Sequence, residues 1–462
     1  MPNTNVLAES TIERLTAQGM QLRAERRYAP AAECLSQVAI ALPDEWLAQY
    51  NAGAVFLEAG LHAEAIAFFE RALALHAFPA GYSLQAHTLA LRGDIAEARA
   101  AYERAVALAP DDFAANWGLF EVDQLLGDDT AALHHQRIAL AQRSVVSIEA
   151  RLLPARTTLL ELCVAGTFQA NIPLDFILDG DRITVHKLYL GEHPVPALPP
   201  YDLVFNTIAD APDAAAPLAA AAHFIAGQDR PALNAPHLVE LTARDRIAAL
   251  FADSARVAVA RTVRTTRSRA TQDRLPFPFL IRPLDSHAGN DLAKIDDDDA
   301  LAAYFAATSQ ADEFFLSAFI DYRNSDGYFR KYRIVFVAGE PYPVHLAISP
   351  RWMIHYYNAP MAENAWMRDE EHAFMRDMDA VFGGVAADGL REIARALPLD
   401  YFGIDCSIAP DGRVLLFEAS TAMIVHMRDP VELYPYKAQY VPRVIRALER
   451  LFDDRLQRGA SD

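Results

Sequence analysis

The sequence predicts a multidomain protein in which an all-α repeat solenoid is followed by an α/β segment and then by an α+β segment. Three observations support this fold class. A repeat of 33–34 residues runs through the first third of the chain, strand-like runs alternate with a helix in the middle, and paired strand-like runs fill the remainder. We expect the three domains to span residues 1–147, 148–241 and 242–462.

The composition is that of a globular protein with several cores, since 52% of the 462 residues are apolar. The net charge of −19 argues against a nucleic-acid binder, which usually carries a basic excess. Three widely separated cysteines, Cys34, Cys163 and Cys406, indicate a reducing compartment without a disulfide framework. No targeting segment follows Met1, and no apolar run approaches about 18 residues. We therefore expect a cytoplasmic protein with no membrane and no nucleic-acid partner.

The repeat places small residues at fixed helical positions and a large residue four positions after one of them. The recurring positions hold Gly19, Gly53 and Ala86, then Ala31, Ala65, Ala98 and Ala132, then Leu35, Phe69 and Tyr102. Small residues let two helices approach closely, and the large residue fills the space beside them. The series resembles the tetratricopeptide repeat, with three good units and a degenerate fourth over about 112–145. That resemblance implies a groove for a peptide or protein partner; a docking or dimerisation platform, and hence a homodimer, is the alternative.

The middle segment combines buried strand-like runs with an Ala-rich helix. The runs are Thr158–Ala165, Ile183–Tyr189 and Tyr201–Asn206, and the helix covers about 213–227. This alternation predicts a small parallel α/β domain. Its loops 166–171 and 206–209 would lie at the carboxyl edge of the sheet, where ligands bind, although plain connections remain the alternative.

The stretch 400–420 predicts a hairpin that brings two acids face to face. A two-residue turn at Asp411-Gly412 would place Asp405 opposite Glu418, with Ser420 on the same face. The other face would be apolar, with Phe402, Ile404, Ile408, Leu415 and Phe417. Opposed like charges are destabilising unless a cation lies between them, and a metal ion would serve. A solvated hairpin face is the alternative.

Three upstream features carry further charge. Arg282 ends a strand and precedes a loop of small residues, which lets backbone N–H groups approach phosphate. An apolar strand over 313–321 follows, and then Arg333 opens the apolar part of the strand 329–337. Burial of Arg333 would need an anionic partner, whereas an edge-strand arginine would lie in solvent. The basic tract 261–269 is either a solvated loop or an approach to an anion.

Taken in order, these elements resemble the ATP-grasp superfamily, in particular its carboxylate–amine and peptide ligases. The resemblance covers about 242–455, and 150–241 is similar in position to the domain that precedes the ATP-grasp core. It implies that ATP and Mg²⁺ are used to activate a carboxylate as an acyl phosphate, which an amine or another nucleophile then attacks. A peptide or carrier protein in a natural-product or peptide-modification pathway would suit the repeat domain. The alternative is a nucleotide-binding scaffold with weakened catalysis.

The resemblance also implies roles for individual residues. Arg282 would contact phosphate, and Arg333 would contact the γ-phosphate or the acyl phosphate. The nucleotide would be bound by Ser286, His287, Ala288, Gly289 and Asn290 over the phosphates, backbone groups of Leu316 and Ala318 at the adenine, Asp321 near the ribose, and Lys331. Mg²⁺ would be held by Asp405, Glu418 and Ser420, and the substrate by His355, His426 and Arg428. Ser420 stands where the family normally has asparagine, Ala318 stands for a glutamate, and Arg282 stands for a lysine.

Overall fold

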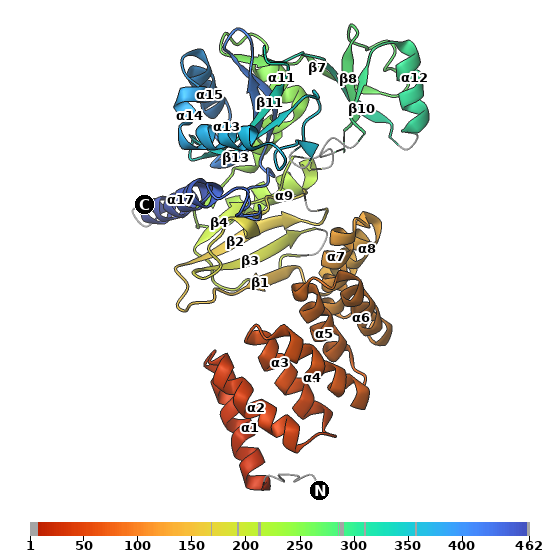
Figure 1. The fold of residues 1–462 in the computed structure, drawn as a ribbon, viewed down its shortest axis with the longest axis vertical. Helices are drawn as coiled ribbons and strands as arrows, with labels where there is room; N and C mark the ends of the chain where they lie inside the picture. Colours follow the sequence, from red (N-terminus) through yellow and green to blue (C-terminus); the bar gives the residue numbers. More distant parts are fainter. Residues whose placement is uncertain are drawn as a thin grey trace. The chain divides into compact units, whose positions relative to one another are not determined.

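The computed structural model describes residues 8–167, 169–191, 194–210, 214–284, 286, 291–308, 311–355 and 358–459. The chain divides into two compact units, Met1–Ser144 and Val145–Asp462. The predicted fold class is confirmed, because eight consecutive helices form a solenoid and a β-rich region with mixed sheets follows it (Figure 1). The division of the second unit at residue 241 stays a prediction. Among the described residues, no helix is both long and apolar enough to cross a membrane.

The first unit is built from helices that each pack against the next one along the chain. Their bounds are α1 Glu9–Ala24, α2 Tyr28–Ala41, α3 Trp46–Glu58, α4 His62–Leu75, α5 Pro79–Arg92, α6 Ile95–Leu108, α7 Phe113–Leu126 and α8 Asp129–Gln142. Gly93 ends α5 with φ 95°, a left-handed conformation that favours glycine.

The predicted small-to-large pairing between helices is also present. A Cβ atom on Gly19 would lie 2.7 Å from Leu35 Cγ, and one on Gly53 would lie 2.8 Å from the Phe69 ring. Only glycine therefore fits at these crossings without displacing a buried neighbour. The repeat pattern of the sequence is thus a pattern of close contacts between successive helices.

The second unit opens with a five-stranded sheet in the order β1-β3-β2-β4-β5, here called the first sheet. Its strands are β1 Val145–Ile148, β2 Thr157–Val164, β3 Ile183–Leu190, β4 Leu203–Asn206 and β5 Ala232–Leu233. All neighbours are parallel except β1, which pairs antiparallel with β3. The sequence missed β1, and the domain boundary predicted after residue 147 falls inside it.

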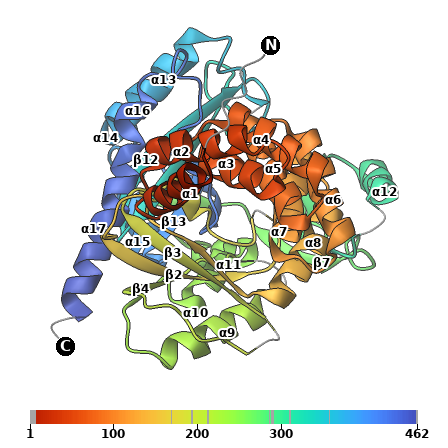
Figure 2. The same ribbon diagram turned by 90° about the horizontal axis from the view of Figure 1, so that it is seen from below.

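Short helices surround the first sheet and connect it to the rest of the unit. They are η1 Leu174–Phe176, α9 Ala215–Ala226, α10 Pro236–Val239, η2 Glu240–Thr242 and α11 Arg244–Leu250. The long C-terminal helix α17, Pro442–Gly459, packs on β4 through an edge-to-face contact between Phe205 and Phe452, whose ring centroids are 6.2 Å apart (Figure 2). The first sheet therefore shares a core with elements from the far end of the chain.

Two more sheets complete the unit. The second sheet, in the order β7-β10-β8-β9, is antiparallel and contains β7 Thr262–Thr266, β8 Phe279–Pro283, β9 Ala293–Ile295 and β10 Glu313–Ala318, with α12 Asp298–Ala307. The third sheet, in the order β12-β11-β13-β14-β6, contains β6 Val257–Val259, β11 Phe329–Val337, β12 Glu340–Ser349, β13 Tyr401–Ile408 and β14 Val414–Ser420. Helices α13 Ala365–Arg376, α14 Met378–Val381, α15 Val385–Ala396 and α16 Lys437–Tyr440 belong to the same part of the chain. The sequence missed β12, a strand that contains His345 and Ser349.

The hairpin β13–β14 differs from the prediction in its turn and in its register. Gly412 N donates to Ala409 O at 2.8 Å, so the loop is the three residues 410–412 rather than two. Pro410 explains the difference, since its fixed φ suits the first central position of the turn and it has no N–H to donate. A β-bulge beside Asp405 then adds one residue to β14 and restores the predicted Asp405–Glu418 pairing.

The shifted turn also changes the predicted faces of β14, because Ile408 pairs with Val414 and not with Leu415. Leu415 and Phe417 were expected to pack with Phe402 and Ile404. Instead, the Phe417 ring packs against the Tyr322 ring in a tilted arrangement, with ring centroids 4.8 Å apart. Leu415 belongs to the same small hydrophobic cluster as these two rings. Phe402 and Ile404 lie in the main core on the other side.

Candidate active site

A cavity of about 440 Å³ lies between the second and third sheets. Strands β7, β8 and β10 line one side, and β11, β13 and β14 line the other. Helix α11, the loops that follow β2 and β4, and the segments after β12 and β14 also contribute to the described lining. The cavity therefore gathers residues from all three sheets of the unit.

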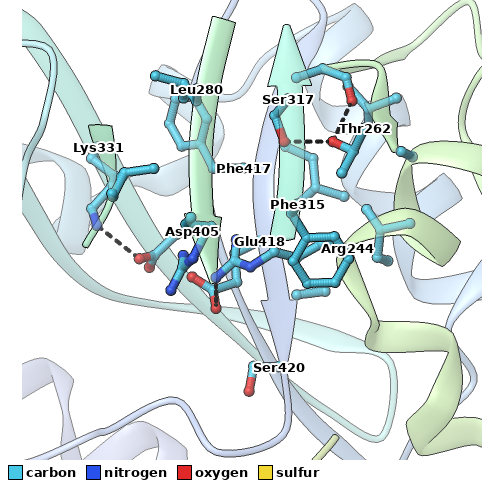
Figure 3. A pocket seen from close by; sticks show the side chains of 18 of the residues that line it. Arg244, Thr262, Leu280, Phe315, Ser317, Lys331, Asp405, Phe417, Glu418 and Ser420 are labelled. Carbon is cyan, nitrogen blue, oxygen red and sulfur yellow. Dashed lines mark hydrogen bonds and ion pairs between the residues drawn. The ribbon is translucent and has the colours of Figure 1, made fainter. Parts of the chain in front are cut away.

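Asp405 and Glu418 lie side by side in this cavity as a cross-strand pair (Figure 3). Protein cations neutralise both of them. Arg333 donates to both oxygens of Asp405, from Nε at 2.8 Å and from Nη2 at 3.0 Å, and Lys331 Nζ lies 3.0 Å from Oδ2. Arg244 Nη2 donates to Glu418 Oε1 at 2.5 Å. The countercharge that the sequence led us to expect from a metal ion is supplied in this structure by three basic side chains.

The same cations keep both carboxyl groups ionised. Burial alone would raise the two pKa values, but Arg333 and Lys331 hold the pKa of Asp405 well below its usual range. Arg244 and Arg282 likewise hold the pKa of Glu418 below its usual value against the effect of burial. The two side chains differ in access, because 33% of the Glu418 side chain is exposed and only 4% of the Asp405 side chain is. Glu418 is therefore the carboxylate that a ligand in the cavity reaches first.

Positive side chains outnumber negative ones in the cavity, although the chain as a whole has a net charge of −19. The described lining contains the five cations Arg244, Arg264, Arg282, Lys331 and Arg333 and the three acids Asp210, Asp405 and Glu418. Such an excess attracts an anion that carries several charges. The cavity thus has the electrostatics of a polyphosphate site.

Arg282 lies at the end of β8, as predicted, and is held in place by Ser286. Its Nε donates to Ser286 Oγ at 3.1 Å, and an η nitrogen donates to the Ser286 carbonyl oxygen. Burial in the first place, and the neighbouring Arg244 in the second, lower the pKa of Arg282 to about 10, so Arg282 remains a cation at neutral pH. Two arginines of this kind, close together and partly desolvated, favour an anionic ligand between them.

The donor atoms fit a magnesium ion that also binds phosphate. Among the described residues no three His, Cys, Asp or Glu side chains form a metal-binding group. Mg²⁺, however, is commonly held by one or two carboxylates together with substrate phosphates and water, and Glu418 and Asp405 meet that requirement. Ser420, the expected third ligand, lies apart from them on β14 (Figure 3), and its Oγ accepts from Ala422 N at 3.1 Å.

One end of the cavity is apolar. Its described lining includes Leu280, Ala318, Phe319, Ile320, Tyr322 and Phe417. The side chain of Leu316 is buried in the core of the second sheet, and β10 pairs with strands on both sides at this position, so a contact of its backbone with adenine stays a prediction. Ala318 does line the cavity, but its N–H already donates to Arg261 O at 2.9 Å.

The other predicted residues divide into three groups. His355 lines the cavity, and burial followed by Lys331 lowers its pKa. Asp321 is exposed and pairs with Arg323 at 3.4 Å rather than lining the described cavity. His287, Ala288, Gly289 and Asn290 lie outside the described residues.

His426 and Arg428, predicted to bind substrate, are not among the described lining residues. Arg428 instead places its guanidinium 4.5 Å from the centre of the Phe176 ring, in η1 beside the first sheet. The backbone N–H of Arg428 donates to His426 Nδ1 at 3.2 Å. Both residues belong to the segment that connects β14 to α16, shortly after the lining residue Ile424.

Sequence reasoning missed three charged residues of the lining, namely Asp210, Arg244 and Arg264. Arg244 opens α11, and 174 positions separate it from Glu418, so no local spacing indicates their contact. Arg264 belongs to the tract for which an approach to an anion was one of two alternatives. Its position on β7 favours that alternative over a solvated loop.

A family model of the tetratricopeptide repeat matches residues 79–112. The match covers α5 and α6 of the first unit. The unit is similar to the first tetratricopeptide domain of Spaghetti (RPAP3) bound to an HSP90 peptide, at 22% identity over 27% of this chain and 98% of that one, with a TM-score of 0.25. It is also similar to MamA from Desulfovibrio magneticus RS-1, at 24% identity over 29% and 76% of the two chains, with a TM-score of 0.27.

A third solved structure overlaps a larger part of the chain. The VanG D-Ala:D-Ser ligase from Enterococcus faecalis matches at 13% identity over 64% of this chain and 99% of that one, with a TM-score of 0.41. No curated protein matches the sequence. At these scores the likenesses to solved structures carry no argument about activity, so the function is argued from the cavity itself.

Proposed function

We propose that the second unit is an ATP- and Mg²⁺-dependent ligase of the ATP-grasp type, which activates a carboxylate as an acyl phosphate and joins it to a nucleophile. The single observation that supports this proposal most strongly is the composition of one cavity. It joins an apolar end to an opposed pair of carboxylates that four cations neighbour, namely Arg244, Arg282, Lys331 and Arg333. This arrangement suits an aromatic base at one end and a metal-bound triphosphate beside it.

The apolar end is suited to the nucleotide base. Tyr322 and Phe417 pack against each other at its wall, and Ala318 and Phe319 continue the wall along the end of β10. Contacts of this kind provide stacking surface while nearby backbone groups provide hydrogen bonds. The cavity of about 440 Å³ is large enough to enclose a drug-sized ligand.

The charged centre is suited to phosphoryl transfer. Arg244, Arg282 and Lys331 would contact phosphate oxygens, and Arg333 would stabilise the charge that develops on the transferred group. Glu418 and Asp405 would hold Mg²⁺, which when bound neutralises the phosphate oxygens.

The proposed reaction has two steps, formation of the acyl phosphate and its attack by the nucleophile. A substrate carboxylate oxygen attacks the γ-phosphorus of ATP, and ADP leaves with the electron pair of the broken P–O bond. The resulting acyl phosphate is then attacked by the nucleophile, and inorganic phosphate leaves. The protein performs little covalent chemistry itself, since positioning and electrostatic stabilisation account for most catalysis of this kind.

The test compares Glu418→Gln with the wild type in two assays on the full chain. Calorimetric titration with a non-hydrolysable ATP analogue should give Mg²⁺-dependent binding that the substitution weakens at least about tenfold, because a carboxylate ligand is lost. Phosphate release with a panel of amino acids and short peptides should fall at least as far. Asp321→Asn, the same loss of charge at an exposed site, is the control. Equal binding by all three proteins, or no nucleotide binding at all, would contradict the proposal.

A nucleotide-binding scaffold without turnover is the second candidate. It is favoured by Ser420, whose Oγ is engaged with Ala422 N, and by Asp405, whose two oxygens are both paired with cations. Nucleotide binding that depends on Glu418, without phosphate release for any member of the panel, would support this candidate instead.

The first unit is proposed to bind a peptide or protein partner that delivers the substrate. An aromatic cluster supports this proposal, with Trp46 lying 4.8 Å from Phe78 and 5.0 Å from His76 between ring centroids, and Tyr50 lying 5.2 Å from Phe78. Such rings are enriched at binding surfaces. Trp46→Ala should raise KM for a peptide substrate and leave kcat unchanged. Unchanged kinetics would favour docking or dimerisation instead.

A further inference from the structure

Asp210 lies in the cavity on a loop that is held rigidly at the carboxyl edge of the first sheet. The loop after β4 pairs with the loop after β2, because Ile172 N donates to Thr207 O at 2.7 Å and Ala209 N donates to Ala170 O at 3.0 Å. These bonds fix the backbone directly before Asp210. The residue therefore enters the cavity from a braced position, and not from a free chain.

Asp210 is also the unpaired carboxyl group of the described lining. Asp405 is paired with Arg333 and Lys331, and Glu418 is paired with Arg244. The side chain of Asp210 forms no ion pair and no hydrogen bond with any residue that the structure describes. A carboxyl group that faces a cavity without a partner is available to a ligand.

The charged groups around Asp210 lie on the neighbouring helical segment and strand. Asp245 and Arg244 begin α11, Glu240 begins η2, and Arg264 lies on β7. Arg244 is already paired with Glu418, and Arg264 lies 3.8 Å from Asp245. This end of the cavity therefore has acids that its cations do not fully neutralise, in contrast to the centre.

Burial in the first place, and the negative charge of Asp245 in the second, raise the pKa of Asp210 to about 7 against the opposing effect of Arg264. A carboxyl group in this range is half ionised at neutral pH. It can accept a proton and release it again within one catalytic cycle, which is the property that general acid–base catalysis requires.

We propose that Asp210 binds the ammonium group of an amine acceptor and takes a proton from it, so that the nucleophile of the ligase is an amine. The proposal rests on the proposed function of the same cavity and specifies the acceptor class that it left open. A cation at the acidic end satisfies the unpaired carboxylate, whereas a neutral hydroxyl or thiol group leaves it buried and uncompensated.

The atoms and charges balance as follows. The ammonium group transfers one proton to the Asp210 carboxylate and becomes a free amine. Its nitrogen lone pair forms the bond to the acyl carbon, and the C–O bond to phosphate breaks with its electron pair on the phosphate oxygen. The second proton of nitrogen moves to the departing phosphate, which leaves as hydrogen phosphate. Asp210 then returns its proton to water.

The experiment measures the amide and the hydroxamate that the full-length protein forms with ATP and Mg²⁺. Each of the twenty amino acids is supplied as acid and as acceptor, each matching α-hydroxy acid is supplied as acceptor, and hydroxylamine is supplied separately. Hydroxylamine is largely unprotonated at neutral pH, so it traps the acyl phosphate as a hydroxamate without a proton acceptor. In Asp210→Asn the ratio of amide to hydroxamate should fall by about 10² or more, which is the usual contribution of general base catalysis.

Two further variants separate catalysis from folding. Asp210→Glu, which keeps the acid, should recover part of the ratio. Asp245→Asn removes the negative charge that raises the pKa of Asp210. The rate of amide formation, which should increase with pH as Asp210 loses its proton, should therefore increase at lower pH in this variant. In Asp210→Asn that increase should be lost. A merely structural role for Asp210 would produce neither the recovery nor the shift to lower pH.

The outcomes distinguish this proposal from the function on which it rests. One outcome overturns the role of Asp210 and leaves the ligase in place. In that outcome the protein forms hydroxamate and also esters from hydroxy acids, and Asp210→Asn does not change the ratio of amide to hydroxamate. Absence of hydroxamate with every acid, together with absence of nucleotide binding, counts against the ligase itself. Amide formation that depends on Asp210 supports both.

Discussion

Replacing Asp405 by asparagine tests the electrostatic description of the cavity most directly. Asp405 is 3% exposed and accepts from two nitrogens of Arg333 at 2.8 and 3.0 Å, with Lys331 Nζ at 3.0 Å. Asparagine has nearly the same shape, keeps one acceptor oxygen and turns an NH₂ group toward these cations. Two largely buried cations then share one neutral partner.

Asp405→Asn should lower the free energy of unfolding by a large amount, although it replaces only one oxygen atom by an NH₂ group. Removing one member of a buried ion pair typically costs about 3–5 kcal/mol, because the remaining charge is left buried without compensation. Asp321→Asn is the matched control, since Asp321 forms an exposed pair with Arg323 and such pairs contribute about 0–1 kcal/mol. The double variant Asp405→Asn/Arg333→Met should lose less than the sum of the two single losses, because the two residues are in direct contact and Arg333 no longer leaves a buried charge without its partner.

The assay is urea unfolding followed by tryptophan fluorescence. With Trp46 and Trp117 replaced by phenylalanine, the signal comes from Trp352 and Trp366, which both belong to the second unit. Unfolding free energies of the variants are then compared in that background. If Asp405→Asn loses no more than about 1 kcal/mol relative to Asp321→Asn, the tight pairing of Asp405 with Arg333 and Lys331 is refuted.

Three further outcomes are expected. Gly118→Ala should destabilise the first unit by about 1–3 kcal/mol in thermal unfolding, because its Cβ would lie 2.0 Å from the buried Tyr102 ring, and Tyr102→Leu in the same chain should recover part of that loss. Burial raises the pKa of Glu161 to about 7, so the free energy of unfolding should fall as pH rises from about 4.5 to 7, and Glu161→Gln should flatten that fall and be more stable at pH 8. Mg²⁺ or a chelator alone should leave the melting temperature within about 1 °C, because Asp405 and Glu418 are already neutralised by cations of the protein.

The solenoid was predictable because its contacts are local. Each small residue meets a large one 16 positions later in the chain, as Gly19 meets Leu35 and Gly53 meets Phe69, so the period of the sequence records the packing. The strand 329–337 was predictable for a similar reason, since nine consecutive residues read as one β-run. In these elements local preference and tertiary contact agree.

The hairpin register was predicted correctly from an incorrect turn. The count assumed a two-residue turn at Asp411-Gly412, whereas Pro410 moves the turn one residue toward β13. A bulge at Phe417 adds the residue that restores Asp405 to its place opposite Glu418. Counting residue pairs outward from the turn does not include the shift of the turn or the bulge. The two changes move the register by one residue in opposite directions and therefore cancel at Asp405.

The charges of the cavity were predictable only in part. Arg333 and Asp405 stood out because each interrupts an apolar strand, and a buried charge requires a partner. Arg244 and Asp210 lie at a helix start and in a loop, where charged residues are common and indicate nothing by themselves. Their importance arises from a fold that brings α11 and the edge of the first sheet to the same cavity.

The bulge in β14 has a consequence for how this cavity can change by mutation. Regular pleating sends neighbouring side chains to opposite faces, yet Phe417 and Glu418 both line the cavity. Deleting Phe417 would return β14 to regular alternation and leave Glu418 opposite Asp405. The ring that closes the apolar end is therefore an insertion in the strand, and its loss or replacement leaves the carboxylate in position. A substitution at position 417 can reshape the apolar end of the cavity without moving the two carboxylates.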